Sequence, residues 1–150
     1  MKRVELEHIL RAASGITGER EFIVIGSQAI LASHPDAPPE LLASRDADLF
    51  HPTNSEATEL VDGTIGELSA YETTFAYYAH GVAEETATLP AGWKDRLVPI
   101  CNENTNGATG WCLDPHDLAI SKLVAGREKD IEYVQALLQH GFVRPAILRE

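Results

Sequence analysis

The sequence predicts a mixed α/β or α+β fold in which helices pack on a small mixed β-sheet. Two observations favour this class. Short runs of β-branched and aromatic residues are interspersed with segments whose apolar residues recur at helical spacing. In addition, 44% of the 150 residues are hydrophobic, which suffices for one ordinary core and leaves no room for a second. We therefore expect a single domain over residues 1–150.

The first third of the chain predicts two helices and two strands. Its one clear loop is "HPDAPPE", residues 34–40, because three prolines forbid regular structure. The stretch "RDADLFHP" alternates polar and apolar residues, as a half-buried strand does, and ends at a proline. The predicted elements are a helix over 4–13, a strand over 21–25, a helix over 27–33 and a strand over 45–52.

The remainder predicts further strands and then helices. A helix over 53–69 has Thr53 or Ser55 as its N-cap. The aromatic and threonine-rich stretches 71–82 and 85–93 favour strands at a sheet edge or in a hairpin. The other predicted elements are paired strands at 96–100 and 111–113, helices at 114–126 and 127–141, and the start of a last helix at 144–150.

The formal net charge of −11 opposes generic binding to DNA or RNA, because that affinity comes from Lys and Arg neutralising phosphates. No apolar run approaches the roughly 20 residues that span a bilayer, and the first residues carry both charges at helical spacing, unlike a signal peptide. We therefore expect a cytoplasmic protein without a membrane segment. Reduced thiols at Cys101 and Cys112 fit that compartment.

Asp46 and Asp48 are the first candidates for chemistry. One residue separates them in a predicted strand, so both side chains leave the same face, roughly 7 Å apart. Two carboxylates aimed together repel each other unless a cation lies between them, and a divalent metal is a common solution. The alternative is a solvated strand face without any site.

Gly26 and Ser27 form the second candidate, since a strand ends there and a helix begins. Free backbone N–H groups, the helix dipole and a hydroxyl would meet at such a junction, where an anion such as a phosphate can settle. The alternative is a tight turn in which Ser27 caps the helix. If the two predicted strands are neighbours, the junction and the Asp pair form one site for a metal-bound triphosphate.

Two charges fall on helix faces that should be buried. Lys122 lies beside the apolar stripe of its helix, and Asp130 precedes Val134 and Leu137 at i+4 and i+7. Burying an unpaired charge is costly, so each needs a partner or a wet cavity. The alternatives are a Lys that extends to solvent and an acid that the helix dipole favours. We expect His80 and His116 to be structural, hydrogen-bonded histidines.

These segments resemble a known family. "VIGSQAI" followed by "SRDADLF" is similar to the signature of the nucleotidyltransferase superfamily with the DNA polymerase β-like fold. "DPHDLAISKLVAGREKDIEYVQALL" resembles the C-terminal half of a bacterial branch that includes nucleotidyltransferase toxins of the abortive-infection type and related uncharacterised domains. The resemblance covers about residues 20–140.

The resemblance implies a role for each candidate. Gly26 and Ser27 would hold nucleotide phosphates, and Asp46 and Asp48 would bind Mg²⁺. Lys122 would place a positive charge on the phosphates. Asp130 would position that lysine or accept the proton of the acceptor hydroxyl.

Three features depart from the family pattern. Between Ser27 and Asp46 lie 18 residues, more than the usual dozen or so. Many relatives carry a third carboxylate on a later strand, but the predicted strand 96–100 has none. Asp95 lies just before that strand, and Asp130 is the other candidate. The short chain also leaves little room for an acceptor-binding domain.

Three functions follow as hypotheses. The first is a Mg²⁺-dependent nucleotidyltransferase that moves NMP from an NTP to a hydroxyl of RNA, protein or a small molecule. The roles that the resemblance implies include the toxin of a toxin–antitoxin pair, which would have an antitoxin as its partner. The second is a catalytically inactive module that binds a nucleotide or a protein partner. The third is a purely structural interpretation of the Asp pair, which predicts no pocket joining Gly26, Asp48 and Lys122.

Overall fold

The computed structural model describes residues 1–148, and it confirms a mixed α/β fold with helices around a five-stranded sheet. The strands are β1 (Glu21–Ile25), β2 (Asp46–Phe50), β3 (Tyr78–Gly81), β4 (Val98–Ile100) and β5 (Thr109–Cys112). The α-helices are α1 (Arg3–Thr17), α2 (Ile30–Ser33), α3 (Ser55–Ile65), α4 (Ala70–Phe75), α5 (Pro115–Ala125), α6 (Glu128–Gln139) and α7 (Pro145–Leu148).

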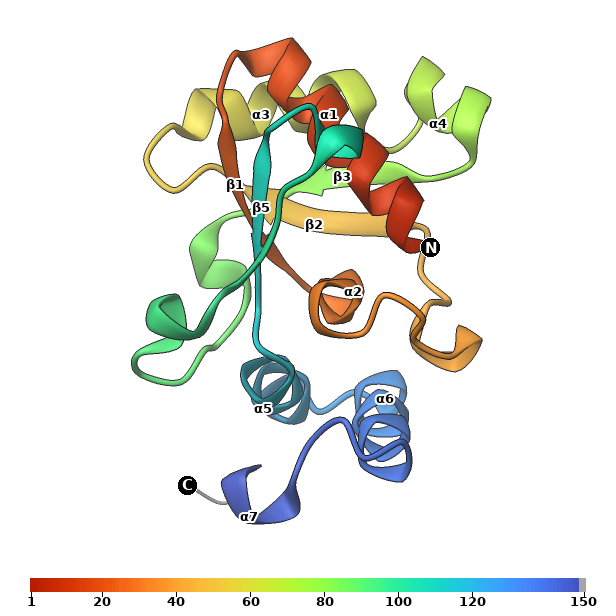
Figure 1. Ribbon diagram of the computed structural model, residues 1–150, viewed down its shortest axis with the longest axis vertical. Helices are drawn as coiled ribbons and strands as arrows, with labels where there is room; N and C mark the ends of the chain where they lie inside the picture. Colours follow the sequence, from red (N-terminus) through yellow and green to blue (C-terminus); the bar gives the residue numbers. More distant parts are fainter. Residues whose placement is uncertain (149–150) are drawn as a thin grey trace.

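The sheet has the order β3-β2-β1-β5-β4 and mixes both strand directions. β1 is antiparallel to β2 and parallel to β5, β2 is parallel to β3, and β4 is antiparallel to β5. Figure 1 shows α1, α3 and α4 on one side of the strands and α5, α6 and α7 on the other. The predicted pairing of the strand near 96–100 with the one near 111–113 is therefore confirmed.

The two faces of the sheet differ in chemistry. Ala47 and Leu49 of β2 are fully buried on the face beneath α1 and α3, together with Phe22 and Val24 of β1. Because side chains alternate along a strand, Asp46 and Asp48 leave the opposite face. One face is thus an apolar core, and the other carries the candidate chemistry.

The middle of the chain differs from the prediction. Residues 70–75 form α4 rather than a strand, since Ser69 caps the helix by accepting a hydrogen bond from the N–H of Glu72. The expected strand over 85–93 is absent from the described residues, where 3₁₀ turns occupy Glu84–Thr86 and Trp93–Arg96. Pro90 and Gly92, the latter with a φ of 78°, explain this turn structure. Of these two stretches, only 71–82 contains a strand, β3, which lies at a sheet edge as predicted.

Most predicted boundaries shift by a few residues. The helix expected over 53–69 is shorter, because it begins after Asn54, whose side chain accepts from the N–H of Ala57, and ends before Gly66. Neither Thr53 nor Ser55 is the cap. The helix expected from Ser27 starts as a 3₁₀ turn, Ser27–Ala29, and continues as α2. Gly26, and not Ser27, occupies its N-cap position.

The C-terminal helices agree closely with the prediction. Asp114 caps α5 with Pro115 at its first position, and Gly126 ends the helix in the left-handed conformation. α6 follows at once with Arg127 as its N-cap. The last predicted helix begins at Pro145, and its expected continuation into residues 149–150 lies outside the described residues.

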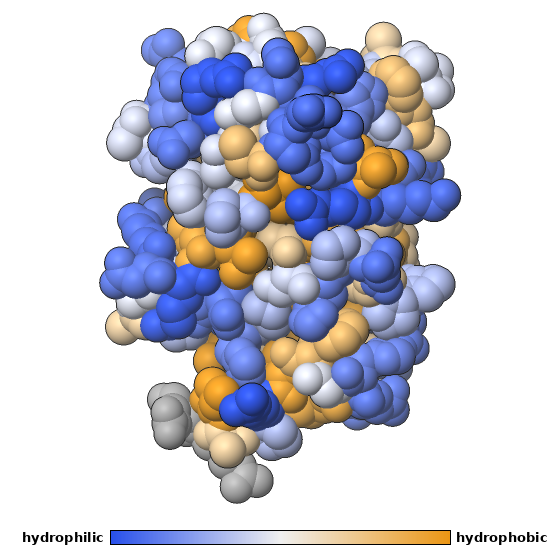
Figure 2. All heavy atoms as spheres, in the orientation of Figure 1, coloured by the Kyte–Doolittle hydropathy of each residue, from blue (hydrophilic) through white to orange (hydrophobic). Residues whose placement is uncertain are grey.

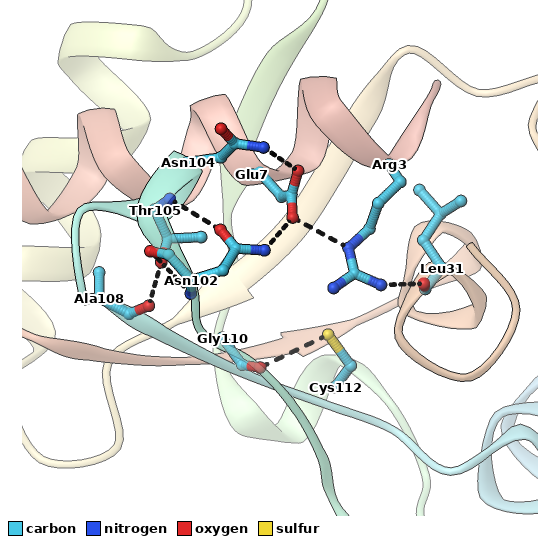
Figure 3. Close-up of polar contacts among 9 residues, drawn as sticks. All are labelled: Arg3, Glu7, Leu31, Asn102, Asn104, Thr105, Ala108, Gly110 and Cys112. Atoms are coloured by element: carbon cyan, nitrogen blue, oxygen red, sulfur yellow. Dashed lines mark hydrogen bonds and ion pairs between the residues drawn. The ribbon is translucent and has the colours of Figure 1, made fainter.

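A polar cluster joins α1 to the loop before β5 (Figure 3). The nearly buried Glu7 carboxylate accepts hydrogen bonds from the side chains of Asn102, Asn104 and Arg3, the last two at 3.0 and 3.3 Å. Arg3 also donates to the carbonyl oxygen of Leu31 at 3.0 Å. These contacts stabilise the packing of three segments that are distant in the sequence.

The surface agrees with the acidic composition. On the face that Figure 2 shows, hydrophilic side chains dominate and the apolar ones form separate, small patches. Among residues 1–148, no helix combines the length and the apolar character that a membrane crossing requires.

Candidate metal and phosphate site

Strand pairing brings three titratable side chains to the sheet face opposite α1. Asp48 is the register partner of Ile25 on one side and of His80 on the other. His80 Nδ1 lies 3.3 Å from Asp48 Oδ1 and 3.9 Å from Asp46 Oδ2. One ligand atom from each of the three residues lies within 4.8 Å of the other two. Asp46, Asp48 and His80 thus converge as the ligands of one metal ion would; we call them the Asp–Asp–His cluster.

Asp48 is partly buried, and one of its oxygens lacks the donor that a buried carboxylate oxygen normally has. Its Oδ1 atom is buried and accepts no hydrogen bond. Burial, together with the neighbouring Asp46, raises the pKa of Asp48 to about 7, and His80 only partly offsets this effect. The carboxyl group therefore lies beside a like charge, and the nearby His80 ring does not compensate for this repulsion and for burial.

Gly26 lets the end of β1 approach this carboxyl group. A Cβ atom at Gly26 would lie 2.6 Å from Asp48 Oδ2, closer than any ordinary contact. The residue also has a φ of 77°, which side chains disfavour. Glycine is thus required here for two reasons, and the backbone of the junction adjoins the cluster directly.

Ser27 is bonded to the C-terminal helices rather than capping its own helix. Its Oγ accepts a hydrogen bond from Lys122 Nζ at 2.7 Å, and its carbonyl oxygen accepts one from the Tyr133 hydroxyl at 2.6 Å. The Tyr133 ring also lies 5.0 Å from Lys122 Nζ, a cation–π distance. These contacts place Lys122, 95 residues further along the chain, beside the glycine junction.

Lys122 and Asp130 are partners, which explains why both charges occupy buried helix faces. Their charged atoms lie 3.6 Å apart, with 14% of the Lys122 side chain and 1% of the Asp130 side chain exposed. Asp130 also accepts from Arg127 Nε at 2.7 Å. Burial acts to raise the pKa of Asp130, but the bonds from Arg127 and the charge of Lys122 outweigh it, so this pKa is lowered. Burial lowers the pKa of Lys122, against the opposing charge of Asp130.

A cavity of about 290 Å³ joins these groups. Its wall includes Gly26, Asp48, Lys122, Arg127 and Asp130. The purely structural interpretation predicts no such pocket, so this cavity contradicts it. Asp46 and His80 adjoin the cavity through Asp48 without lining it. Ser27 lines a neighbouring cavity of about 370 Å³ that shares Lys122 and Asp130 with the first.

A larger cavity, of about 510 Å³, is less suited to a nucleotide. It lies between α3 and the segment after β3, and its wall carries Glu59, Asp62, Glu84 and Glu85 but no Lys or Arg. Such a wall repels phosphates. The smaller cavity differs in that two cations, Lys122 and Arg127, line it beside Asp48 and Asp130.

A divalent cation fits the Asp–Asp–His cluster. Carboxylate oxygens and an imidazole nitrogen are all metal ligands, and the buried Oδ1 atom of Asp48 is an acceptor that forms no hydrogen bond, although His80 Nδ1 lies 3.3 Å away. The third candidate ligand, His80, differs from the expected carboxylate. The predicted strand 96–100 corresponds to β4, which lies at the far edge of the sheet. Among the described residues, the group that could hold a metal ion contains His80 but neither Asp95 nor Asp130.

A glycine junction that faces an Asp pair across antiparallel strands, with a largely buried lysine beside it, agrees with the resemblance to nucleotidyltransferases. Residues 4–141 match the model of a family described as nucleotidyltransferase of unknown function (DUF6036), and the chain belongs to this family. A search of the curated proteins and a search of the solved structures returned no match.

The sequence prediction missed three participants in this site. His80 was expected to be structural, because a lone histidine in a strand has no spacing signal, and only the β2–β3 pairing puts it beside Asp48. Tyr133 follows Asp130 by three residues, so the helical period was a usable signal. Arg127 directly precedes α6, where a side chain that reaches Asp130 is not evident from residue type.

Proposed function

We propose that the protein is a divalent-metal-dependent nucleotidyltransferase that transfers NMP from an NTP to a hydroxyl group, with Mg²⁺ as the cation implied by the family. The observation that carries this proposal is the cavity shared by Gly26, Asp48, Lys122 and Asp130. This cavity supports the proposal because the Asp48 carboxylate and the Lys122 ammonium group both line it.

The cationic and the acidic side chains of the site would have different roles. Lys122 and Arg127 would attract the phosphate chain and offset the negative charge that grows on the leaving pyrophosphate. Gly26, with no side chain, leaves its backbone open to a phosphate oxygen. A divalent cation bound by Asp46 and Asp48 would act as a Lewis acid on phosphate oxygens and would lower the pKa of an acceptor hydroxyl.

Of the two roles that the resemblance offers for Asp130, its contacts support positioning. Its lowered pKa makes it a poor proton acceptor near neutral pH. It also pairs with Lys122, whose ammonium group contacts Ser27 and the Tyr133 ring as well. Asp130 and Tyr133 are therefore positioning residues for the Lys122 ammonium group.

The acceptor is a hydroxyl of RNA, protein or a small molecule. The net charge of −11 favours a protein or small-molecule acceptor over long nucleic acid. The proposal includes a toxin role with a cognate antitoxin as partner, which the family resemblance implies. It also includes a cytoplasmic location, which we expect from the sequence.

A second candidate, an inactive module that binds a nucleotide or a protein, is favoured by one observation. The cluster holds two carboxylates and a histidine, where many relatives have three carboxylates. In this case, the chain would bind NTP and transfer nothing.

Label transfer separates the two candidates. The protein is incubated with Mg²⁺ or Mn²⁺, total RNA or cell protein, and each NTP carrying ³²P at the α or the γ position. Nucleotidyl transfer moves the α label to the acceptor and releases the γ label with pyrophosphate. Asp48→Asn is the inactive variant. Asp36→Asn, which removes one acid from an exposed loop, is its matched control.

We expect α label in an acceptor for the wild type and Asp36→Asn, and none for Asp48→Asn. Transfer of the γ label alone would indicate a kinase and contradict the proposal. NTP binding without any transfer would favour the inactive module.

A further inference from the structure

His80 occupies the place beside the Asp pair where a third ligand is needed. It lies on β3, the edge strand next to β2, and is the register partner of Asp48. Its ring is within 3.3 Å of Asp48 Oδ1 and 3.9 Å of Asp46 Oδ2. About half of its side chain is exposed, so water or a ligand can reach the ring.

An ion pair alone does not explain this arrangement. A half-exposed His–Asp pair contributes little stability because solvent screens it. The nearby ring also leaves Asp48 Oδ1 without a hydrogen bond, although that atom is buried. A cation bound by all three residues would satisfy the Asp48 oxygen and both carboxylate charges.

The identity of the third ligand bears on which cation binds. Mg²⁺ prefers oxygen ligands in near-ideal octahedral geometry and keeps several waters. Imidazole nitrogen favours first-row transition metals over Mg²⁺. A mixed set of two carboxylates and one imidazole therefore differs from the all-oxygen set that suits Mg²⁺ best.

We infer that His80 is a metal ligand and that it shifts the selectivity of the Asp–Asp–His cluster from Mg²⁺ toward a transition cation such as Mn²⁺. This inference rests on the proposed function for the existence of the metal site. It assigns to His80 a role in choosing the cation, in addition to the roles of Asp46 and Asp48.

Equilibrium metal binding tests the inference without reference to activity. Mn²⁺ and Mg²⁺ affinities of the full chain are measured by calorimetry, and bound Mn²⁺ is followed by electron paramagnetic resonance. The variants are His80→Ala, which removes the nitrogen ligand, and His80→Asp, which replaces it with a carboxylate. His140→Ala is the matched control, because His140 is also partly exposed and pairs with an acid, Glu40, outside the cluster.

We expect His80→Ala to weaken Mn²⁺ binding at least ~10-fold, since loss of even an outer-shell partner commonly costs 10- to 100-fold. Mg²⁺ binding should fall less, because water replaces the ring. His80→Asp should strengthen Mg²⁺ binding and lower the Mn²⁺-to-Mg²⁺ affinity ratio. His140→Ala should match the wild type.

Two results overturn the inference, and they differ in what else they imply. If His80→Ala leaves Mn²⁺ affinity unchanged while Asp48→Asn abolishes it, His80 is not a ligand, but the metal site and the proposed function stand. If the wild type binds neither cation, with or without NTP, the proposed function fails as well.

Discussion

Two carboxylates in this molecule, the buried Glu7 and the partly buried Asp48, have opposite surroundings. Glu7 accepts hydrogen bonds from two amides and a guanidinium, which outweigh the effect of burial and lower its pKa (Figure 3). Asp48 has a second carboxylate beside it and an oxygen with no donor, and its pKa is raised to about 7. The cluster around Glu7 is complete without any ligand, whereas the one around Asp48 is not.

We interpret this difference as that between a structural polar group and a candidate functional one. A satisfied cluster stabilises the fold, because each buried charge has a partner. An unsatisfied one destabilises the free protein and is retained where a ligand supplies the missing interaction. Replacing each carboxylate by its amide should consequently have opposite effects on stability at Glu7 and at Asp48.

The largest expected effect is on transfer. Asp48→Asn should reduce NMP transfer at least about 10²-fold, because it removes a charge that binds the cation. Glu7→Gln should leave transfer per folded molecule unchanged. Initial rates on folded protein, with the folded fraction measured by circular dichroism, provide the comparison. Equal losses in both variants would contradict the division between the clusters.

The next effect is on stability, and it concerns Glu7. Glu7→Gln should lower the free energy of unfolding by about 1–3 kcal/mol, since an uncharged amide meets the donors of Asn102, Asn104 and Arg3. For a chain of this size, we expect a fall in Tm of several degrees. Thermal unfolding at pH 7 measures it, and an unchanged Tm would show that the contacts of Glu7 are energetically neutral.

A third effect is on the stability of Asp48→Asn; it depends on pH, and its sign is opposite to that of Glu7→Gln. Below about pH 4, Asp48 is protonated in both the folded and the unfolded protein, so Asp48→Asn should change little. As pH rises to 7, the unfolded state ionises first, and the metal-free wild type loses stability relative to the variant. Above pH 7, Asp48→Asn should be more stable by roughly 1–3 kcal/mol. Urea unfolding in EDTA at pH 4, 6 and 8 measures this gap, and a gap that shrinks with rising pH would contradict the raised pKa.

The smallest expected effect comes from the glycine junction. Gly26→Ala combines a left-handed φ with a Cβ atom 2.6 Å from Asp48 Oδ2. We expect a loss of about 1–2 kcal/mol in stability and weaker metal binding, because Asp48 must shift. Gly18→Ala, also left-handed but with no atom within 4 Å of the added Cβ, is the control for strain alone. Equal metal affinity in both variants would mean that the junction does not shape the cluster.

The sequence predicted the Asp46–Asp48 pair and the Lys122–Asp130 pair separately, but it predicted less well that the two pairs lie together. The alternation around Asp46 and Asp48 indicates that both leave one strand face, and the helical period indicates that Lys122 and Asp130 are misplaced charges. Their convergence needs the β1–β2 pairing and the packing of α5 against α6, which depend on contacts between distant segments.

Other features had no local signal at all. His80 is a ligand candidate only through the order of the strands. Glu7 lies on an ordinary amphipathic helix, and nothing in its neighbours indicates that two asparagines about a hundred residues away bond to it. The turns at 84–96 are decided by Pro90 and Gly92 against a composition that favours strands.

The thermal stability of the protein with and without a divalent cation at pH 8 tests the central claim most directly. Saturating Mn²⁺ or Mg²⁺ should raise the Tm of the wild type, because a ligand that binds only the folded state stabilises it, by about 2.7 kcal/mol at 100 times Kd. Glu7→Gln should begin lower and rise by the same amount, whereas Asp48→Asn should begin higher and not rise. If neither cation changes the wild-type Tm, or if the Tm of Asp48→Asn rises equally, the assignment of the Asp–Asp–His cluster as a metal site is contradicted.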